Sequence, residues 1–176
     1  DRGAVITRSI NDLVRDPTQF RPVQEQYFPG STFKIITLSA ALNAAIMPKD
    51  ETFYCGLTWD GSATYGDTAS PRKDWRADEP ADSPVNMATG DVYPWQALAA
   101  SCNPFFYEMG ARLFIQRGDG ALTNTAQGMG LGSVTGLDGF VEASGTIPVP
   151  TNVESGINEA IGQGGVQVSI LQMARM

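Results

Sequence analysis

Apolar residues follow a helical spacing most clearly in residues 31–47. Phe33, Ile36 and the alanines after them recur every three or four positions along this stretch. The pattern predicts a largely buried helix, in which Ser31 is the N-terminal cap and Pro48 is the terminator. We therefore expect this stretch to form a main element of the core.

Two shorter helices are predicted around the segment Ser-Cys-Asn at positions 101–103. Pro94 stands at a first helical position and is followed by an apolar run to residue 100. Pro104 begins a second helix, whose apolar positions continue to Phe114. The segment between them is thus predicted to be a tight link.

The remaining positions show weaker periodicity. Residues 50–92 have no sustained period and predict a long irregular excursion. Residues 123–129 and 168–176 each predict a short helix, and the proline-flanked stretch 147–151 predicts extended chain. Residues 1–30 join a short apolar piece to a polar, proline-containing stretch, and predict a leader rather than a packed element. No internal repeat is present.

The composition indicates one globular domain. The chain has 176 residues, 42% of them hydrophobic, which is enough for one sizeable core, and we expect residues 1–176 to form a single domain. Twelve basic against 19 acidic residues give a net charge of −7, with no basic stripe of the kind that binds nucleic acid. Because no apolar run reaches about 18 residues, no membrane span is predicted.

The absence of histidine and the presence of only two cysteines limit the kinds of catalytic and metal site that the chain can form. The sequence contains no histidine, which excludes a Ser-His-Asp triad, a Cys-His nucleophile and a histidine-ligated metal site. General acid–base catalysis would therefore have to use carboxylates, lysine, tyrosine or water. Cys55 and Cys102 lack CxxC spacing, which excludes a zinc ribbon and leaves either one disulfide or two buried thiols.

Ser31 and Lys34 form the first candidate pair for catalysis. Their i, i+3 spacing places both side chains on one face of the predicted helix, so that an amine can reach a hydroxyl. A serine in the first helical turn also lies where free backbone N–H groups favour developing negative charge. Lys34 would act as a base only if burial or a neighbouring cation lowered its pKa. The alternative is a capped helix with a surface lysine.

Four segments in a fixed order carry a resemblance to a known family. They read FPGSTFK at 28–34, ALAASCN at 97–103, AIGQG at 160–164 and LQMA at 171–174. This ordered set resembles the transpeptidase domain of penicillin-binding proteins, the serine acyltransferases that cross-link bacterial peptidoglycan. The resemblance extends from about Tyr27 to the C-terminus.

The resemblance implies a role for each matching side chain. Ser31 would be the nucleophile that attacks a D-Ala-D-Ala carbonyl or a β-lactam ring, and Lys34 would take its proton. Ser101 would relay a proton to the leaving group, and Asn103 would orient Lys34 and the substrate amide. Cys102 occupies the variable middle position and needs no catalytic role.

The resemblance also implies a fold and a location. The expected class is α/β (α+β), β-lactamase/transpeptidase-like, represented mainly by the helical lobe with an incomplete central antiparallel sheet. None of the three lysines is followed by Thr-Gly or Ser-Gly, so the third family motif, Lys-Thr/Ser-Gly, is absent. We therefore expect an incomplete transpeptidase domain. No cofactor or metal is implied. Members of the family work outside the bacterial cytoplasmic membrane. A segment absent from this chain would tether the protein to that membrane. An oxidising location would permit a disulfide between Cys55 and Cys102.

Two other functions stay open at this point. A β-lactam hydrolase would share the acylation step; Glu154, within Glu-Ser-Gly-Ile-Asn, faintly resembles the deacylation motif of class A β-lactamases, but Glu142 and Glu154 are better explained as surface carboxylates. A non-catalytic penicillin-binding sensor or scaffold relative would keep the fold without using Ser31.

The long excursion contains two sets of residues with both functional and structural interpretations. Its aromatic residues and their neighbours could line a substrate groove, but we expect them to attach the loop to the body; they are Trp59, Tyr65, Trp75, Tyr93 and Trp95. Its aspartates lack the calcium-loop pattern and predict a solvated acidic loop; they are Asp67, Asp74, Asp78, Asp82 and Asp91.

Overall fold

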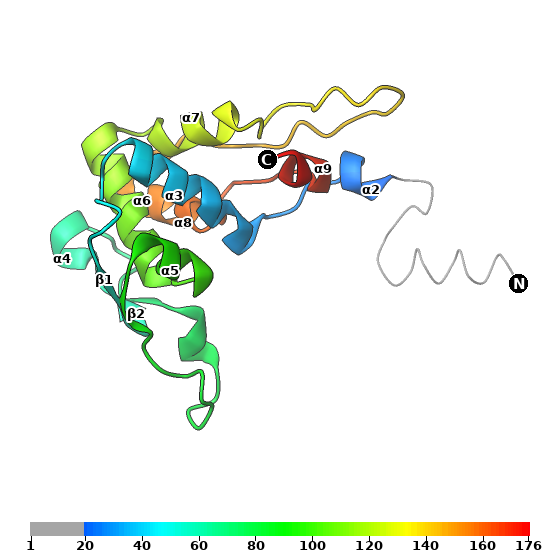
Figure 1. Ribbon diagram of the computed structural model, residues 1–176. Coiled ribbons are helices and arrows are strands. Elements are labelled where there is room, and N and C mark those ends of the chain that lie inside the picture. The colour runs from blue at the N-terminus through cyan, green and yellow to red at the C-terminus, as the bar shows by residue number, and fades with distance from the viewer. Residues whose placement is uncertain (1–19) are drawn as a thin grey trace, which may run out of the picture.

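The computed structural model describes residues 20–176 (Figure 1). Most of the predicted leader, residues 1–19, lies outside the described residues. The elements in chain order are α2 (Arg21–Gln24), the 3₁₀ helix η1 (Gly30–Phe33), α3 (Lys34–Asn43), β1 (Phe53–Cys55), β2 (Thr58–Trp59), α4 (Ser62–Tyr65), β3 (Arg72–Lys73), the 3₁₀ helix η2 (Trp75–Asp78), β4 (Gly90–Val92), α5 (Pro94–Ala99), α6 (Asn103–Arg117), α7 (Ala121–Gly128), α8 (Val153–Ala160) and α9 (Ile170–Arg175).

Helices α3, α6, α7 and α8 form the main core, with α6 packed against the other three (Figure 1). The helices predicted from residues 31–47, 94–100, 104–114 and 123–129 are thus confirmed, although the first ends at Asn43 and begins as the 3₁₀ turn η1. Phe33, Ile36 and Phe105 are fully buried between them. Apolar side chains at helical spacing therefore face one another across the bundle.

The helix α8 was not predicted. It has only eight residues and contains Gly156, which weakens the helical pattern. The side chain of Asn152 caps its first turn by accepting from Ser155 N at 2.8 Å. Gly110 of α6 lets the two helices approach closely, since a Cβ there would lie 2.7 Å from Ala160 Cβ and 2.9 Å from Gly156 O.

One carboxyl group is buried inside this helical core. Glu159 of α8 is 2% exposed, and its Oε2 atom has no hydrogen-bond partner within residues 20–176. Its Oε1 atom accepts a long hydrogen bond of 3.4 Å from Thr123 of α7. Burial raises the pKa of Glu159 from 4.5 to about 8, because the charged form has lost water without gaining a cation.

Two small antiparallel ladders organise the long excursion, which is therefore less irregular than predicted. β1 pairs with β4, with Phe53 opposite Val92, and β2 pairs with β3, with Trp59 opposite Arg72. Each strand is only two or three residues long, too short for a period to show in the sequence. Helices with small antiparallel sheets agree with the expected α/β (α+β) class.

Aromatic side chains attach the excursion to the helices, as expected for two of them. Trp59 Nε1 donates to Glu108 Oε2 of α6 at 2.9 Å, and Tyr65 OH donates to the other oxygen of Glu108 at 2.6 Å. The Trp59 and Tyr65 rings are stacked with centroids 5.9 Å apart. Tyr93, Trp75 and Trp95 are 40%, 42% and 64% exposed, and of these Trp75 donates a long hydrogen bond of 3.4 Å to the carbonyl of Ala100 at the end of α5. Glu108 thus binds both Trp59 and Tyr65 to α6.

The N-terminal part of the described chain is packed, which corrects the prediction of an unpacked leader for residues 20–30. Val23 of α2 is 2% exposed, and α2 lies beside α9 at the other end of the sequence (Figure 1). Tyr27 pairs with Val168 in an isolated antiparallel bridge. In the part of the chain that the structure describes, no helix has the length and apolar character needed to cross a membrane.

Candidate active site

Ser31 lies in an exposed 3₁₀ turn at the entrance to the first core helix. It is the second residue of η1, not the side-chain cap that the sequence predicted, since Pro29 precedes the turn and provides no side-chain hydrogen bond. Gly30 N donates to Gly162 O at 3.1 Å, and a Cβ on Gly162 would lie 2.2 Å from Gly30 O. The turn that presents Ser31 is thus held by a close backbone contact that requires glycine.

Lys34 begins α3 one turn after Ser31 and is fully buried. Its ammonium donates to the carbonyl oxygen of Ser101 at 2.8 Å, to Ser101 Oγ at 3.0 Å and to Asn103 Oδ1 at 2.5 Å. These contacts use the three donors of an ammonium group. The side chain is therefore fixed against the Ser-Cys-Asn segment, and the alternative of a surface lysine is wrong.

Ser101 connects the buried amine to the exposed hydroxyl. Its Oγ donates to Ser31 Oγ at 3.1 Å and accepts from Lys34 Nζ. Its backbone φ is +51°, in the left-handed region that residues other than glycine seldom adopt. This conformation lets the carbonyl and the hydroxyl of one residue face Lys34 together, so the predicted tight link is confirmed in an unusual geometry.

The surroundings of Lys34 favour its neutral form. The pKa of Lys34 is lowered from 10.5 to about 8, mainly by burial and also by the charge of Arg76, while nearby Asp74 acts in the opposite direction. Nζ lies over the Phe106 ring at 5.2 Å from its centroid, a cation–π contact that favours the charged form and so opposes the effect of burial. An amine with a pKa near 8 can both accept and return a proton close to neutral pH.

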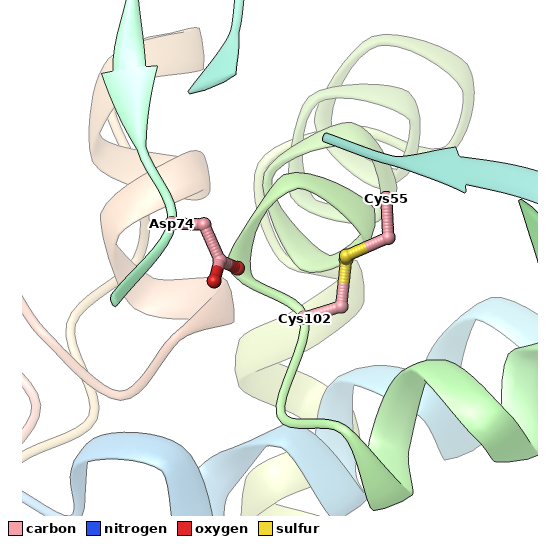
Figure 2. Close-up of side chains that lie close together, drawn as sticks. All are labelled: Cys55, Asp74 and Cys102. Atoms are coloured by element: carbon pink, nitrogen blue, oxygen red, sulfur yellow. A yellow bond between two sulfur atoms is a disulfide. The ribbon is translucent and has the colours of Figure 1, made fainter. Parts of the chain in front are cut away.

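Behind the Ser-Cys-Asn segment lies a cluster of Cys55, Asp74 and Cys102 (Figure 2), and Arg76 is hydrogen-bonded to two of its members. The two cysteines form a disulfide between β1 and the start of α6, which decides between the two possibilities left by the sequence. Arg76 donates from Nε to Asp74 Oδ1 at 2.7 Å and from Nη2 to Cys55 Sγ at 3.0 Å. The disulfide sulfur of Cys102 also accepts from Phe105 N at 3.3 Å.

The same cluster has the residue types of a metal site but no free donor set. The ligand atoms of Cys55, Asp74 and Cys102 lie within 4.8 Å of one another. Both sulfurs are bonded to each other, and the Asp74 oxygens accept from Arg76 and from the backbone of Asn103. These atoms therefore serve the protein's own structure.

The prediction of a solvated acidic loop is wrong for two of its five aspartates. Asp74 is fully buried, and Asp67 is 1% exposed. Asp67 binds Arg72 through two hydrogen bonds of 2.6 and 2.7 Å. Each buried carboxylate has an arginine two to five positions later in the chain, which offsets the cost of burial.

The family model for the penicillin binding protein transpeptidase domain matches residues 5–176. The chain belongs to this family. The match covers both the turn of Ser31 and Lys34 and the segment of Ser101 and Asn103, and it extends through α9.

Individual relatives of this transpeptidase domain are similar at a modest level. The peptidoglycan D,D-transpeptidase PbpA of Mycolicibacterium smegmatis is 29% identical over 168 residues, which are 95% of this chain and 31% of that protein. The chain thus spans about a third of the length of the curated relatives it matches.

Solved structures agree with the architecture. Penicillin-binding protein A from Mycobacterium tuberculosis, solved as a ceftriaxone acyl-enzyme complex, aligns with a TM-score of 0.71 and 27% identity over 97% of this chain and 35% of that one. PBP2 of Pseudomonas aeruginosa, solved in complex with WCK 5153, aligns with a TM-score of 0.77 over 96% of this chain and 37% of its own, but at 21% identity it supports the fold alone.

The structure brings together the four side chains that the sequence singled out, Ser31, Lys34, Ser101 and Asn103. Sequence reasoning missed the roles of Asp74, which binds the backbone of Asn103 from behind, and of Arg76, which binds Asp74. The only local signal was the i, i+2 pairing of opposite charges in Asp-Trp-Arg, which does not indicate the distant backbone that Asp74 binds.

Proposed function

We propose that this chain contains the acylation site of a serine D,D-transpeptidase that cross-links peptidoglycan stem peptides. The observation that carries the proposal is the hydrogen-bonded path from Lys34 Nζ through Ser101 Oγ to Ser31 Oγ, with steps of 3.0 and 3.1 Å. An exposed hydroxyl joined to a buried amine of lowered pKa meets the need of a serine nucleophile without histidine.

In the acylation step, Ser31 Oγ bonds to the carbonyl carbon of the penultimate D-Ala. Its proton passes to the neutral amine of Lys34, for which Ser101 Oγ provides a path. The bond from that carbonyl to the terminal D-Ala nitrogen then breaks, and the proton returns through Ser101 to the leaving amine. The products are an ester on Ser31 and a free D-Ala.

In the second step, an amine on a neighbouring stem peptide attacks the ester carbonyl. The C–O bond to Ser31 breaks, the new amide forms the cross-link, and the amine's proton restores the Ser31 hydroxyl. Asn103 orients Lys34 through its Oδ1 atom and leaves its amide NH₂ for a substrate carbonyl. The backbone N–H of Ser31, in the first turn of η1, is a donor for the oxyanion.

β-Lactams would acylate Ser31 in the same way and block it. The ceftriaxone acyl-enzyme of the similar M. tuberculosis protein supports this part of the proposal. Family membership supports a site of action outside the bacterial cytoplasmic membrane, on peptidoglycan. The proposed steps use side chains and backbone only, so they need no metal or cofactor.

The test is the intact mass of the full-length protein after exposure to benzylpenicillin, beside a Ser31→Ala variant. We expect an adduct of one ligand mass on the unaltered protein and none on the variant. Ser39→Ala is the matched control, because Ser39 lies in the same helical stretch and bonds only the Ile35 carbonyl among the described residues. An adduct that persists in Ser31→Ala, or is absent from the unaltered protein, would refute the proposed nucleophile.

The same experiment separates the two other functions. A β-lactam hydrolase would release the adduct quickly and turn over a chromogenic cephalosporin, whereas a transpeptidase keeps the ester for much longer. A non-catalytic sensor or scaffold relative that does not use Ser31 would give no adduct at Ser31. Glu154 is the one residue whose sequence surroundings resemble a deacylation motif. It accepts a hydrogen bond from Thr68 at 3.0 Å and is not part of the hydrogen-bonded path from Lys34 to Ser31.

A further inference from the structure

Asp74 is a buried carboxylate directly behind the proposed acylation site. It is fully buried, and Figure 2 shows it beside the Cys55–Cys102 disulfide at the start of the helix that follows Cys102. Its Oδ2 atom accepts from the backbone N–H of Asn103 at 2.9 Å. Its Oδ1 atom accepts from Arg76 N at 3.1 Å and from Arg76 Nε at 2.7 Å.

The backbone group that Asp74 binds belongs to the residue whose side chain binds Lys34. Asn103 is the first residue of α6, so its N–H has no partner within that helix. A carboxylate at this position satisfies the N–H and is favoured by the helix dipole. Asn103 is therefore fixed on one side by Asp74 and on the other by Lys34 Nζ at 2.5 Å.

The neighbouring Ser101 makes such an anchor necessary. Its φ of +51° is costly for a residue with a side chain and persists only where the surroundings hold it. Lys34 holds this segment from the side of the active site, through the carbonyl and hydroxyl of Ser101. Asp74 and the disulfide of Cys102 hold it from the opposite side.

We propose that Asp74 is a positioning residue for acylation, which fixes the Ser101–Asn103 segment against Lys34 through its hydrogen bond to Asn103 and acts on Lys34 through its charge. The inference rests on the proposed function and goes beyond it, because the matching motifs assign Asp74 no role. Asp74 touches neither Ser31 nor a substrate, and its effect passes through Asn103 and Lys34.

The charge of Asp74 has a definite direction. Asp74 raises the pKa of Lys34, while burial and Arg76 lower it. The other groups packed against Lys34 do not titrate near neutral pH: they are the Phe106 ring, the hydroxyl and carbonyl of Ser101 and the side-chain amide of Asn103. Replacing Asp74 with asparagine leaves Arg76 as the dominant charge, so the pKa of Lys34 should fall below its present value.

A purely structural role is the competing explanation, and Asp67 provides the matched control. Asp67 is equally buried in the same excursion and is paired with Arg72, but it does not contact the Ser-Cys-Asn segment. Asp67→Asn therefore weakens the excursion without acting on Asn103. Asp74→Asn keeps the size of the side chain and removes its charge.

The experiment measures the acylation rate by benzylpenicillin from pH 5.5 to 9.5 in the unaltered full-length protein, Asp74→Asn and Asp67→Asn. For Asp74→Asn we expect a maximal rate lower by about tenfold to a hundredfold, the loss typical of one hydrogen bond to a charged group. In the plot of acylation rate against pH, the rising part should move to lower pH, because Lys34 becomes neutral at a lower pH. Asp67→Asn should lower the melting temperature without shifting the pH dependence of the acylation rate.

A second readout keeps this inference separate from the proposed function. NMR titration of the lysine Cε resonances reports the pKa of Lys34 whether or not the protein is acylated, and the resonance that disappears in Lys34→Arg is assigned to Lys34. A lower Lys34 pKa in Asp74→Asn, but not in Asp67→Asn, supports the inference. If both variants leave that pKa and the acylation profile unchanged, or change them equally, the inference is overturned. Absence of acylation in the unaltered protein refutes the proposed function instead.

Discussion

Asn103 Oδ1 lies 2.5 Å from Lys34 Nζ, which joins the first residue of α6 to the first residue of α3. Helices α3 and α6 pack against each other in the core, so this contact lies where two rigid elements meet. The Ser-x-x-Lys and Ser-Cys-Asn segments are thus placed by helix packing rather than by mobile loops. Changes at this junction should therefore act on the chemistry more than on the fold.

Asn103→Ala should slow acylation by benzylpenicillin about tenfold to a hundredfold, because Lys34 loses one of its three acceptors and is less well oriented. The rate is measured by the time course of adduct mass. Asn124→Ala, at an exposed position on α7, should leave the rate unchanged. Equal rates in the two variants would contradict a role for the Asn103 side chain.

The acylation rate should rise with pH and level off above about pH 8, since the neutral form of Lys34 is the proposed base and its pKa is about 8. Below this pH the rate should fall about tenfold for each pH unit. Stopped-flow acylation with a chromogenic β-lactam gives the profile. Lys34→Arg keeps the charge but cannot lose its proton, and should show no such rise. A flat profile in the unaltered protein would exclude Lys34 as the base.

Gly162→Ala should destabilise the domain by about 3 to 5 kcal/mol, because a Cβ there meets Gly30 O at 2.2 Å and the φ of +69° disfavours a side chain. Gly164→Ala has a similar φ of +73°, but its Cβ would come no closer than 3.6 Å, to Asn158. It should cost only about 1 to 2 kcal/mol. Urea unfolding measures both, and similar losses would show that the contact with Gly30 does not matter.

Removing the Cys55–Cys102 disulfide should cost about 2 to 4 kcal/mol of unfolding free energy, because the unfolded chain regains the freedom of a long loop. The double variant Cys55→Ala, Cys102→Ala should melt at a lower temperature than the oxidised protein. Dithiothreitol should lower the melting temperature of the unaltered protein and leave the double variant unchanged. Equal melting of the oxidised protein and the double variant would show that the bond adds no stability.

Glu159→Gln should stabilise the protein above neutral pH and have little effect near pH 4. The pKa of Glu159 is 4.5 in the unfolded chain and about 8 when folded, so the folded state holds the proton more tightly. This tighter proton binding contributes fully to the free energy of unfolding below about pH 4.5, and the contribution is lost as the pH rises to about 8.

At pH 8 the gain from glutamine should be about 1 to 3 kcal/mol, in the range of one buried polar group without a partner. Glu154→Gln, at a half-exposed position on the same helix, serves as the control for replacing a glutamate of α8. Urea unfolding at pH 4.5, 6 and 8 tests the difference, and parallel curves for Glu159→Gln and the unaltered protein would contradict it.

The sequence predicted the parts of the molecule that depend on local pattern. Apolar spacing and the position of Pro104 placed the helices around the site, and the i, i+3 spacing of Ser31 and Lys34 placed them together. The order of the four motifs identified the family, which the family model confirmed. The roles of the individual site residues stay predictions until acylation is measured.

The features that the sequence did not predict depend on contacts between distant segments. The left-handed φ of Ser101 is held by Lys34, and the burial of Asp74 depends on the N-terminus of α6. The ladders of β1 to β4 are too short to give a period, and the contacts that attach them to α6, from Trp59 to Glu108 and from Cys55 to Cys102, join residues far apart in the sequence. Local propensity carries none of this information.

The contact between Gly30 and Gly162 also bears on the stage of synthesis at which the proposed site around Ser31 can form. The turn that presents Ser31 is closed by the carbonyl of Gly162, and α3 is held by a buried bond from Thr37 to the carbonyl of Ala160. Because the chain leaves the ribosome from its N-terminus, the serine emerges long before these partners exist. A nascent chain therefore contains the proposed nucleophile well before it contains the residues that hold the turn of Ser31 and the helix α3 in place.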